Sequence, residues 1–277
     1  MLAFALIAFG SLFEEVTLSL NKIIMTRRLQ TLSVLGFLQS LVTLVFYLIY
    51  GSLAPHGFVF SWSSWVTVSI RTVLEVFIAY CTMQAVAKAE RSAYGFIRAF
   101  TVPLLLVVDV AFGYRLGLLQ QIGILVTFVS VAVLTMNHGF SKKGIGWVIA
   151  TALTAVLTVS LYKYDLNFNS VASEQSIMYA ASTIFFFALI MRTKEDVFGL
   201  LKTKGVPWAI LSACFGSLLQ GLSYQYAAGS WIIAMKRACG VLLAVLSGRV
   251  AFKEEKLGLK LAAFAGCLTG FLLMVLG

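Results

Sequence analysis

The sequence has few of the side chains that build metal sites and hydrolytic active sites. Only two histidines occur in 277 residues, and both His56 and His138 fall in short connections between apolar segments. The four cysteines stand apart from one another, without a Cys-x-x-Cys pair. A zinc site needs several such ligands, and a Ser-His-Asp triad needs a positioned histidine. We therefore expect no metal, no cofactor and no catalytic residue, and we expect the cysteines to be small apolar fillers.

Charge is also scarce, since charged residues make up 12% of the chain, against about a quarter in soluble proteins. Hydrophobic residues reach 60%, and the mean hydropathy is +0.95. This composition excludes an ordinary soluble domain and is typical of a polytopic membrane protein. The net charge of +10 does not indicate a nucleic-acid partner, because the basic residues are scattered between long apolar runs.

Apolar runs of about 20 residues, each long enough to cross a bilayer, predict an all-α protein with ten transmembrane helices. The first run is expected to be a retained span and not a signal peptide, because Glu14 and Glu15 interrupt it and no small-residue cleavage site follows. Short connections leave no room for a soluble domain. The expected ranges are 2–25, 32–50, 62–87, 92–112, 116–136, 144–162, 176–191, 207–227, 231–252 and 257–276.

The distribution of basic residues predicts the orientation. Counting Lys260, in the first turn of the last expected helix, thirteen Lys and Arg residues belong to the odd-numbered connections, whereas the even-numbered ones hold only Arg115 and Lys163. Positive charge is retained in cytoplasmic loops. The odd connections are therefore expected in the cytoplasm and both termini outside it.

Two stretches of the chain share a weak pattern. Arg98 is followed by an apolar run and by Arg115-Leu-Gly-Leu118, and Arg237 is followed by an apolar run and by Lys256-Leu-Gly-Leu259. The pattern indicates a duplication into halves 1–138 and 139–277, each with five helices. An odd number of helices in each half makes equivalent helices cross in opposite directions, so we expect an inverted repeat.

The first expected helix carries an unusual polar face. Ser11, Glu15, Ser19 and Lys22 recur at helical spacing, and Glu14 lies beside them. One interpretation is a carboxylate that binds a cationic group or takes a proton during transport. The other is a buried pair with Lys22 or with a basic residue of another helix.

Two further helices carry polar residues at helical spacing. Arg71 and Glu75 are one turn apart on the third helix, which favours an ion pair. On the eighth, Ser217, Gln220 and Tyr224 form a stripe that either orients an uncharged polar ligand or joins helices.

The fourth helix contains Pro103 between Arg98 and Asp109, and the proline predicts a kink with a free carbonyl near mid-membrane. Gly240, Ala244 and Gly248 on the ninth helix, like Ala262, Gly266 and Gly270 on the tenth, predict close helix packing.

Lys236 and Arg237 are adjacent, so they point about 100° apart on the ninth helix. Lys236 shares the glycine face and is expected to be buried against another helix. Arg237 corresponds to Arg98 in the repeat. Our hypothesis is that both arginines reach a central cavity from opposite membrane sides and hold a carboxylate or phosphate. The alternative is that each pairs with a resident acid such as Glu14, Glu15 or Glu75.

The segment from Ala234 to Glu255, with Phe-Lys-Glu near its end, resembles the second-repeat segment of the EamA-like branch of the drug/metabolite transporter superfamily. The segment from Gln84 through Arg98 to Gly117 is similar to the first-repeat counterpart. The resemblance implies alternating access around a cavity walled mainly by helices one, three, four, six, eight and nine. Family members often have cytoplasmic termini, whereas the charge count here predicts the opposite.

Nine residues are the resulting candidates for substrate binding or coupling. The resemblance places six of them on cavity-forming helices, and the polar patterns and the start of the ninth helix add three. They are Glu14, Glu15, Arg98, Tyr224, Lys236 and Arg237, with Glu75, Gln220 and Trp231.

The sequence predicts a secondary transporter for a small polar or zwitterionic metabolite in the cytoplasmic membrane. No G-x-x-x-x-G-K-[ST] run occurs, so energy is expected from a gradient, with a coupling proton or ion, or from exchange. The alternatives are a non-transporting membrane subunit or scaffold and, against the scarcity of catalytic side chains, a lipid-modifying enzyme. A monomer and a homodimer both remain open.

Overall fold

The structure, a computed structural model, describes residues 2–27, 32–54, 57–111, 117–137, 141–193, 197–226 and 229–276. Within these ranges all regular structure is helical. The elements are α1 (Leu2–Arg27), α2 (Leu32–Leu53), η1 (Trp62–Ser64), α3 (Trp65–Lys88), α4 (Arg91–Ala99), α5 (Thr101–Ala111), α6 (Leu118–Met136), α7 (Ile145–Asp165), α8 (Val171–Thr193), α9 (Val197–Leu201), α10 (Val206–Tyr226), α11 (Gly229–Phe252) and α12 (Leu257–Leu276).

In the described part of the chain, nine helices are long and apolar enough to cross a bilayer. Large apolar side chains remain exposed on their outer faces, among them Val73 at 71% and Val250 at 83%. Such surfaces suit lipid and not water. The chain is therefore a polytopic α-helical membrane protein.

The span expected over 92–112, with a kink at Pro103, is interrupted at Phe100, which separates α4 from α5. Pro103 has no N–H to donate to the carbonyl four residues earlier, which weakens a helix at this point. At the break, the Thr101 hydroxyl donates to the Arg98 carbonyl at 2.7 Å. Pro103 then stands in the first turn of α5, where a missing N–H is tolerated. The side chain of Asp109 lies outside the described residues, and so does its predicted relation to Arg98.

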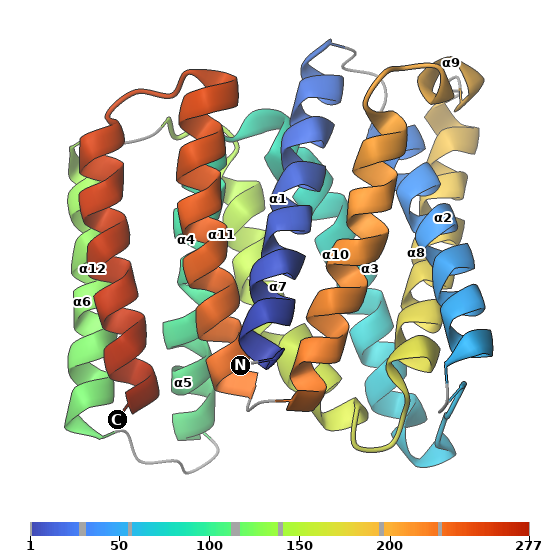
Figure 1. The fold of residues 1–277 in the computed structure, drawn as a ribbon, viewed down its shortest axis with the longest axis horizontal. Helices are drawn as coiled ribbons and strands as arrows, with labels where there is room; N and C mark the ends of the chain where they lie inside the picture. The colour runs from blue at the N-terminus through green and yellow to red at the C-terminus, as the bar shows by residue number, and fades with distance from the viewer. Residues whose placement is uncertain are drawn as a thin grey trace.

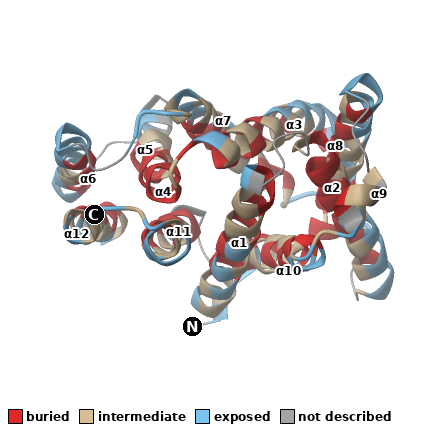
Figure 2. Cartoon of the chain, turned by 90° about the horizontal axis from the view of Figure 1, so that it is seen from above, coloured by how far each residue is buried: buried red, intermediate tan, exposed pale blue. Residues whose placement is uncertain are grey.

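The long helices run roughly side by side, and both chain ends lie at the same end of the bundle (Figure 1). Seen along the bundle, α6 and α12 form one edge and α2, α8 and α9 the other (Figure 2). Between the edges stand α1, α3, α4, α5, α7, α10 and α11, with buried faces turned towards one another. This middle group holds half of the buried polar side chains of the described residues, among them Glu15, Arg71, Arg91 and Arg237.

Small residues allow two close helix contacts. A Cβ atom on Gly123 of α6 would lie 2.6 Å from the Gly270 carbonyl oxygen of α12, and one on Gly95 of α4 would lie 2.9 Å from the Ala244 Cβ of α11. Gly240, predicted to pack in the same way, has no atom within 4 Å of its would-be Cβ. Its carbonyl oxygen nevertheless lies 3.6 Å from the would-be Cβ of Gly95, so Gly240 takes part in the α4–α11 contact while its own Cβ position borders a cavity.

Candidate functional site

A cavity of about 300 Å³ lies in the middle of the bundle, which is the lower end of the usual range for ligand pockets. We call it the main cavity. Its walls come from α1, α3, α4, α7, α10 and α11, as the resemblance implies, and also from α8. Its charged and amide lining residues are Glu14, Arg71, Glu75, Arg98, Gln175, Gln220 and Lys236.

Glu14 is the centre of a polar cluster on one wall. Its Oε1 lies 3.3 Å from Arg98 Nη1, and its Oε2 lies 3.3 Å from Lys236 Nζ. Gln220 donates to Glu14 Oε2 at 2.7 Å and accepts from Lys236 at 2.5 Å. We call these four residues the Glu14 cluster. One carboxylate thus balances two cations contributed by two other helices.

Two glycines place Glu14 in this position. A Cβ atom on Gly10 of α1 would lie 3.2 Å from the Gln220 nitrogen of α10, and one on Gly216 of α10 would lie 3.2 Å from the Glu14 nitrogen. Larger residues would push the two backbones apart. The close crossing of α1 and α10 brings the Gln220 side chain within reach of Glu14.

Glu15, although adjacent in sequence, is bound elsewhere. Its carboxylate accepts from Arg91 Nε at 3.1 Å and Nη2 at 2.7 Å, from Ser247 at 2.5 Å and from Ser19 at 2.9 Å. The structure therefore gives Glu15 the second of its two interpretations, a buried pair with a basic residue of another helix. Lys22 is not that partner, since it donates to the Ala89 carbonyl at 2.7 Å.

A second buried ion pair joins Arg71, in the wall of the main cavity, to Glu174 behind it, near the ends where α3 and α8 begin (Figure 1). Arg71 Nη1 lies 2.6 Å from Glu174 Oε2, whereas the predicted pair with Glu75 is present but long, at 3.9 Å. Glu174 also accepts from Asn169 at 2.7 Å. The prediction missed Glu174 because the expected helix began at 176 and left this acid in a connection.

The candidates Tyr224 and Trp231 lie in different places. Tyr224 lines the main cavity, and its ring meets that of Tyr162 edge-on with centroids 5.5 Å apart. Trp231 is 45% exposed and lines an apolar recess with Phe4 and Ile7. The structure does not bring Trp231 to the main cavity.

The two basic residues of α11 both border cavities, and Lys236 also contacts α1 and α10 through Glu14 and Gln220. Lys236, expected to be buried against a helix, lines the main cavity. Arg237 is the more buried, at 7% exposure, and lines a second, smaller cavity. Arg98 borders both cavities and pairs with the resident acid Glu14.

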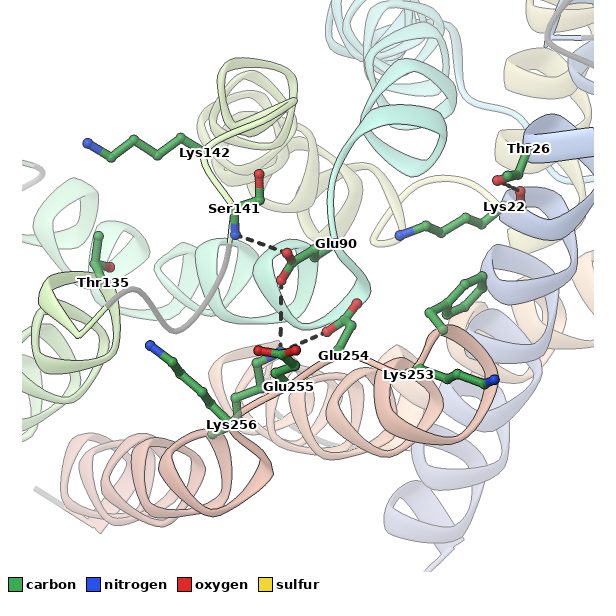
Figure 3. A pocket seen from close by; sticks show the side chains of 12 residues that line it. Lys22, Thr26, Glu90, Thr135, Ser141, Lys142, Lys253, Glu254, Glu255 and Lys256 are labelled. Carbon is green, nitrogen blue, oxygen red and sulfur yellow. Dashed lines mark hydrogen bonds and ion pairs between the residues drawn. The ribbon is translucent and has the colours of Figure 1, made fainter.

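A wide hollow lies at the end of the bundle where α4 and α12 begin (Figure 3). Glu254, in the turn between α11 and α12, lies in its wall. It accepts from the Arg91 N–H at 2.6 Å, the Ser92 hydroxyl at 2.5 Å and Lys260 Nζ at 3.0 Å. A carboxylate is favourable at the start of a helix, here α4. Glu254 thereby joins the second half of the chain to the first.

Several favourable contacts together outweigh the effect of burial on the pKa of Glu254. Burial by itself raises the pKa of its carboxyl, but hydrogen bonds from Ser92 and Lys260 and the Lys260 charge hold that pKa below its usual range. A carboxylate with a lowered pKa stabilises the fold above the pKa of the unfolded chain, about 4.3. The contribution disappears as pH falls through the lower folded value.

We expect Glu254→Gln to lower the unfolding free energy by about 1.5 to 3 kcal/mol at neutral pH, the usual size for hydrogen bonds to a charged group. The variant should also lose stability less steeply than the wild type below about pH 5, because the titrating group is gone. Thermal unfolding in detergent across this pH range measures both effects. Glu255→Gln is the matched control, since Glu255 is exposed in the same turn. Equal unfolding temperatures for Glu254→Gln and wild type at neutral pH would contradict the prediction.

Neither a family model nor a curated protein matches the chain. Among the described residues, no group of three or more His, Cys, Asp or Glu could hold a metal ion. The argument for function therefore depends on the cavities and the buried charges around them.

Proposed function

We propose that this chain is a secondary transporter that moves a small polar or zwitterionic metabolite across the cytoplasmic membrane by alternating access. The main support is a polar cavity in the middle of a membrane bundle, with one buried ion pair in its wall, Arg71–Glu174, and another, Arg91–Glu15, outside its lining. Charged groups at this depth are costly and usually mark a pathway. The proposal makes the protein a relative of the EamA-like transporters and not an enzyme.

Each of the two ion pairs joins helices that would have to separate to open one side of the cavity, so the pairs can act as two gates. Arg91, Glu15 and Ser247 join α4, α1 and α11 on one side, and Arg71 with Glu174 joins α3 to α8 on the other. Separating either pair loses the ionic attraction but returns both groups to water, which offsets the loss. One gate can therefore open while the other holds the cavity closed.

The helix contacts support the inverted repeat within this proposal. The first half would contain α1 to α6, with α4 and α5 as one crossing, and the second half α7, α8, α10, α11 and α12. The equivalent helices are α1 and α7, α2 and α8, α3 and α10, α4–α5 and α11, and α6 and α12. Replacing each helix by its equivalent turns the α1–α10 contact into the α7–α3 contact, and the structure contains both. The contacts α2–α8, α4–α11 and α6–α12 map onto themselves. This is the pattern of a two-fold relation between halves.

Uptake and counterflow into liposomes that contain the purified chain test the proposal directly, with a panel of amino acids, small carboxylates, sugars and amines. We expect at least one solute to enter saturably and to exchange with unlabelled solute inside, and protein-free liposomes to show neither. If no solute of the panel enters faster than it enters protein-free liposomes, a non-transporting subunit or scaffold is favoured.

We also predict that both termini face away from the cytoplasm, because thirteen basic residues belong to the odd connections and two to the even ones. A reporter active only in the cytoplasm should stay silent when fused after the last residue. The same reporter inserted between Lys142 and Lys143, in an odd connection, should be active. Activity of the terminal fusion would show that the orientation is reversed.

A further inference from the structure

A second cavity, which we call the inner pocket, lies behind the Glu14 cluster. It measures about 30 Å³ and is lined by Ser11, Glu14, Arg98, Lys236, Arg237 and Gly240, among others. Glu14, Arg98 and Lys236 also line the main cavity. Together with Leu18 and Tyr94, which also line both, these three side chains form the partition between the two spaces.

The inner pocket has more positive than negative charge. Arg98, Lys236 and Arg237 supply three cations, and Glu14 is ion-paired with the first two. Glu15 also borders the pocket, but Arg91 and Ser247 already bind its carboxylate. Among the described residues, no carboxylate lies within ion-pair distance of Arg237. A buried guanidinium with no carboxylate in direct contact is unfavourable, and an anion bound beside Arg237 would relieve this cost.

Unsatisfied donors point to the same conclusion. The Nε of Arg237, the Nε of Arg98 and the Ser11 hydroxyl are buried without a hydrogen-bond partner in the described part of the chain. Ser11 is 2% exposed and Arg237 7%. Buried polar groups are normally hydrogen-bonded, and exceptions of this kind mark places where a ligand or water binds.

The space beside Arg237 matches a small anionic group. A volume of about 30 Å³ holds about two water molecules, and a carboxylate presents two oxygens. Gly240, one turn after Arg237, leaves this space open, since nothing lies within 4 Å of its would-be Cβ. A guanidinium binds a carboxylate through two parallel N–H donors.

We propose that the inner pocket binds the carboxylate of the transported solute, with Arg237 as the bidentate donor and Ser11 as a further donor. The remainder of the solute then lies in the main cavity, next to the Glu14 cluster. This inference rests on the proposed function and narrows its substrate class to solutes with a carboxylate.

Thermal unfolding of the full chain in detergent tests the inference, with sodium butyrate as the probe and butyramide, its neutral isostere, as the comparison at constant ionic strength. A ligand that binds only the folded state raises the unfolding temperature with concentration. We expect butyrate to do so and butyramide not to. Methylphosphonate tests whether the pocket takes a phosphonate instead.

Four variants locate the effect. Arg237→Gln should abolish stabilisation by butyrate. Arg237→Lys should weaken butyrate binding about tenfold, because lysine lacks the two parallel N–H donors of the guanidinium. Gly240→Val fills the pocket without changing any charge and should also abolish it. Arg249→Gln, an exposed arginine on the same helix, should behave as wild type.

Stabilisation by butyrate that survives in both Arg237→Gln and Gly240→Val would overturn the inference. So would equal stabilisation by butyramide, stabilisation by methylphosphonate alone, or no stabilisation of the wild type. The liposome assay separates this failure from failure of the proposed function. Saturable transport of a solute without a carboxylate would refute the inference and keep the transporter. Butyrate binding that depends on Arg237 and Gly240, without transport of any solute, would keep the carboxylate site and refute the proposed transport.

Discussion

Replacing Arg91 with glutamine is expected to lower the unfolding free energy by about 3 to 5 kcal/mol, the usual cost of removing one partner of a buried ion pair. Arg91 is 1% exposed and donates twice to Glu15, whose carboxylate is itself buried. Glutamine cannot neutralise that carboxylate, which then remains in an apolar bundle with the two serine hydroxyls as its other donors.

Equilibrium unfolding in detergent measures this loss. Arg192→Gln is the matched control, because Arg192 is exposed at the end of α8 and should change stability by less than about 0.5 kcal/mol. The double variant Glu15→Gln/Arg91→Gln should recover part of the loss, since no buried charge is left unpaired. A single variant no less stable than the control would show that the pair is not part of the folded core.

The second large effect is expected on transport. Glu14→Gln keeps the shape of the side chain but removes the one carboxylate that balances Arg98 and Lys236. The excess positive charge should hold an anionic solute more tightly and release it more slowly. We therefore expect the maximal uptake rate to fall at least about tenfold, equivalent to about 1.4 kcal/mol, while the KM falls or stays constant.

Initial uptake rates in liposomes at matched protein content measure both constants. Glu75→Gln provides a comparison in the same cavity, because Glu75 contacts one cation only, at 3.9 Å. Its effect should be smaller. Unchanged uptake in Glu14→Gln would make the Glu14 cluster a structural contact between helices and not a part of the pathway.

Most of the fold could be predicted from the sequence, because an apolar run of about 20 residues has few alternatives to a membrane helix. The break at Phe100 could not. Pro103 signals a weak point in a helix, but whether the helix bends or stops depends on local partners such as the Thr101 hydroxyl. Helix ends were also misplaced where polar residues begin an apolar run, as at Val171.

The candidate residues were recognisable because a charge inside an apolar run is expensive. Their partners were not, because neighbours such as Glu14 and Glu15 differ only in the rotation of α1. The contact of Gly10 with Gln220 sets that rotation, and it joins residues far apart in the sequence. Arg91 and Glu254 escaped notice because they lie at the ends of apolar runs, where charges are common.

The interruption at Phe100 divides one membrane crossing into two short rods joined by a single residue. The rod α4 carries Arg91 at its far end and Arg98 next to the joint. Its nine residues span about 13 Å at 1.5 Å per residue, so a tilt of about 10° at the joint displaces Arg91 by about 2 Å. That displacement is enough to break the hydrogen bonds from Arg91 to Glu15, while Arg98 scarcely moves. A small tilt of α4 can therefore separate the Arg91–Glu15 pair, one of the two proposed gates, and leave the Glu14 cluster intact.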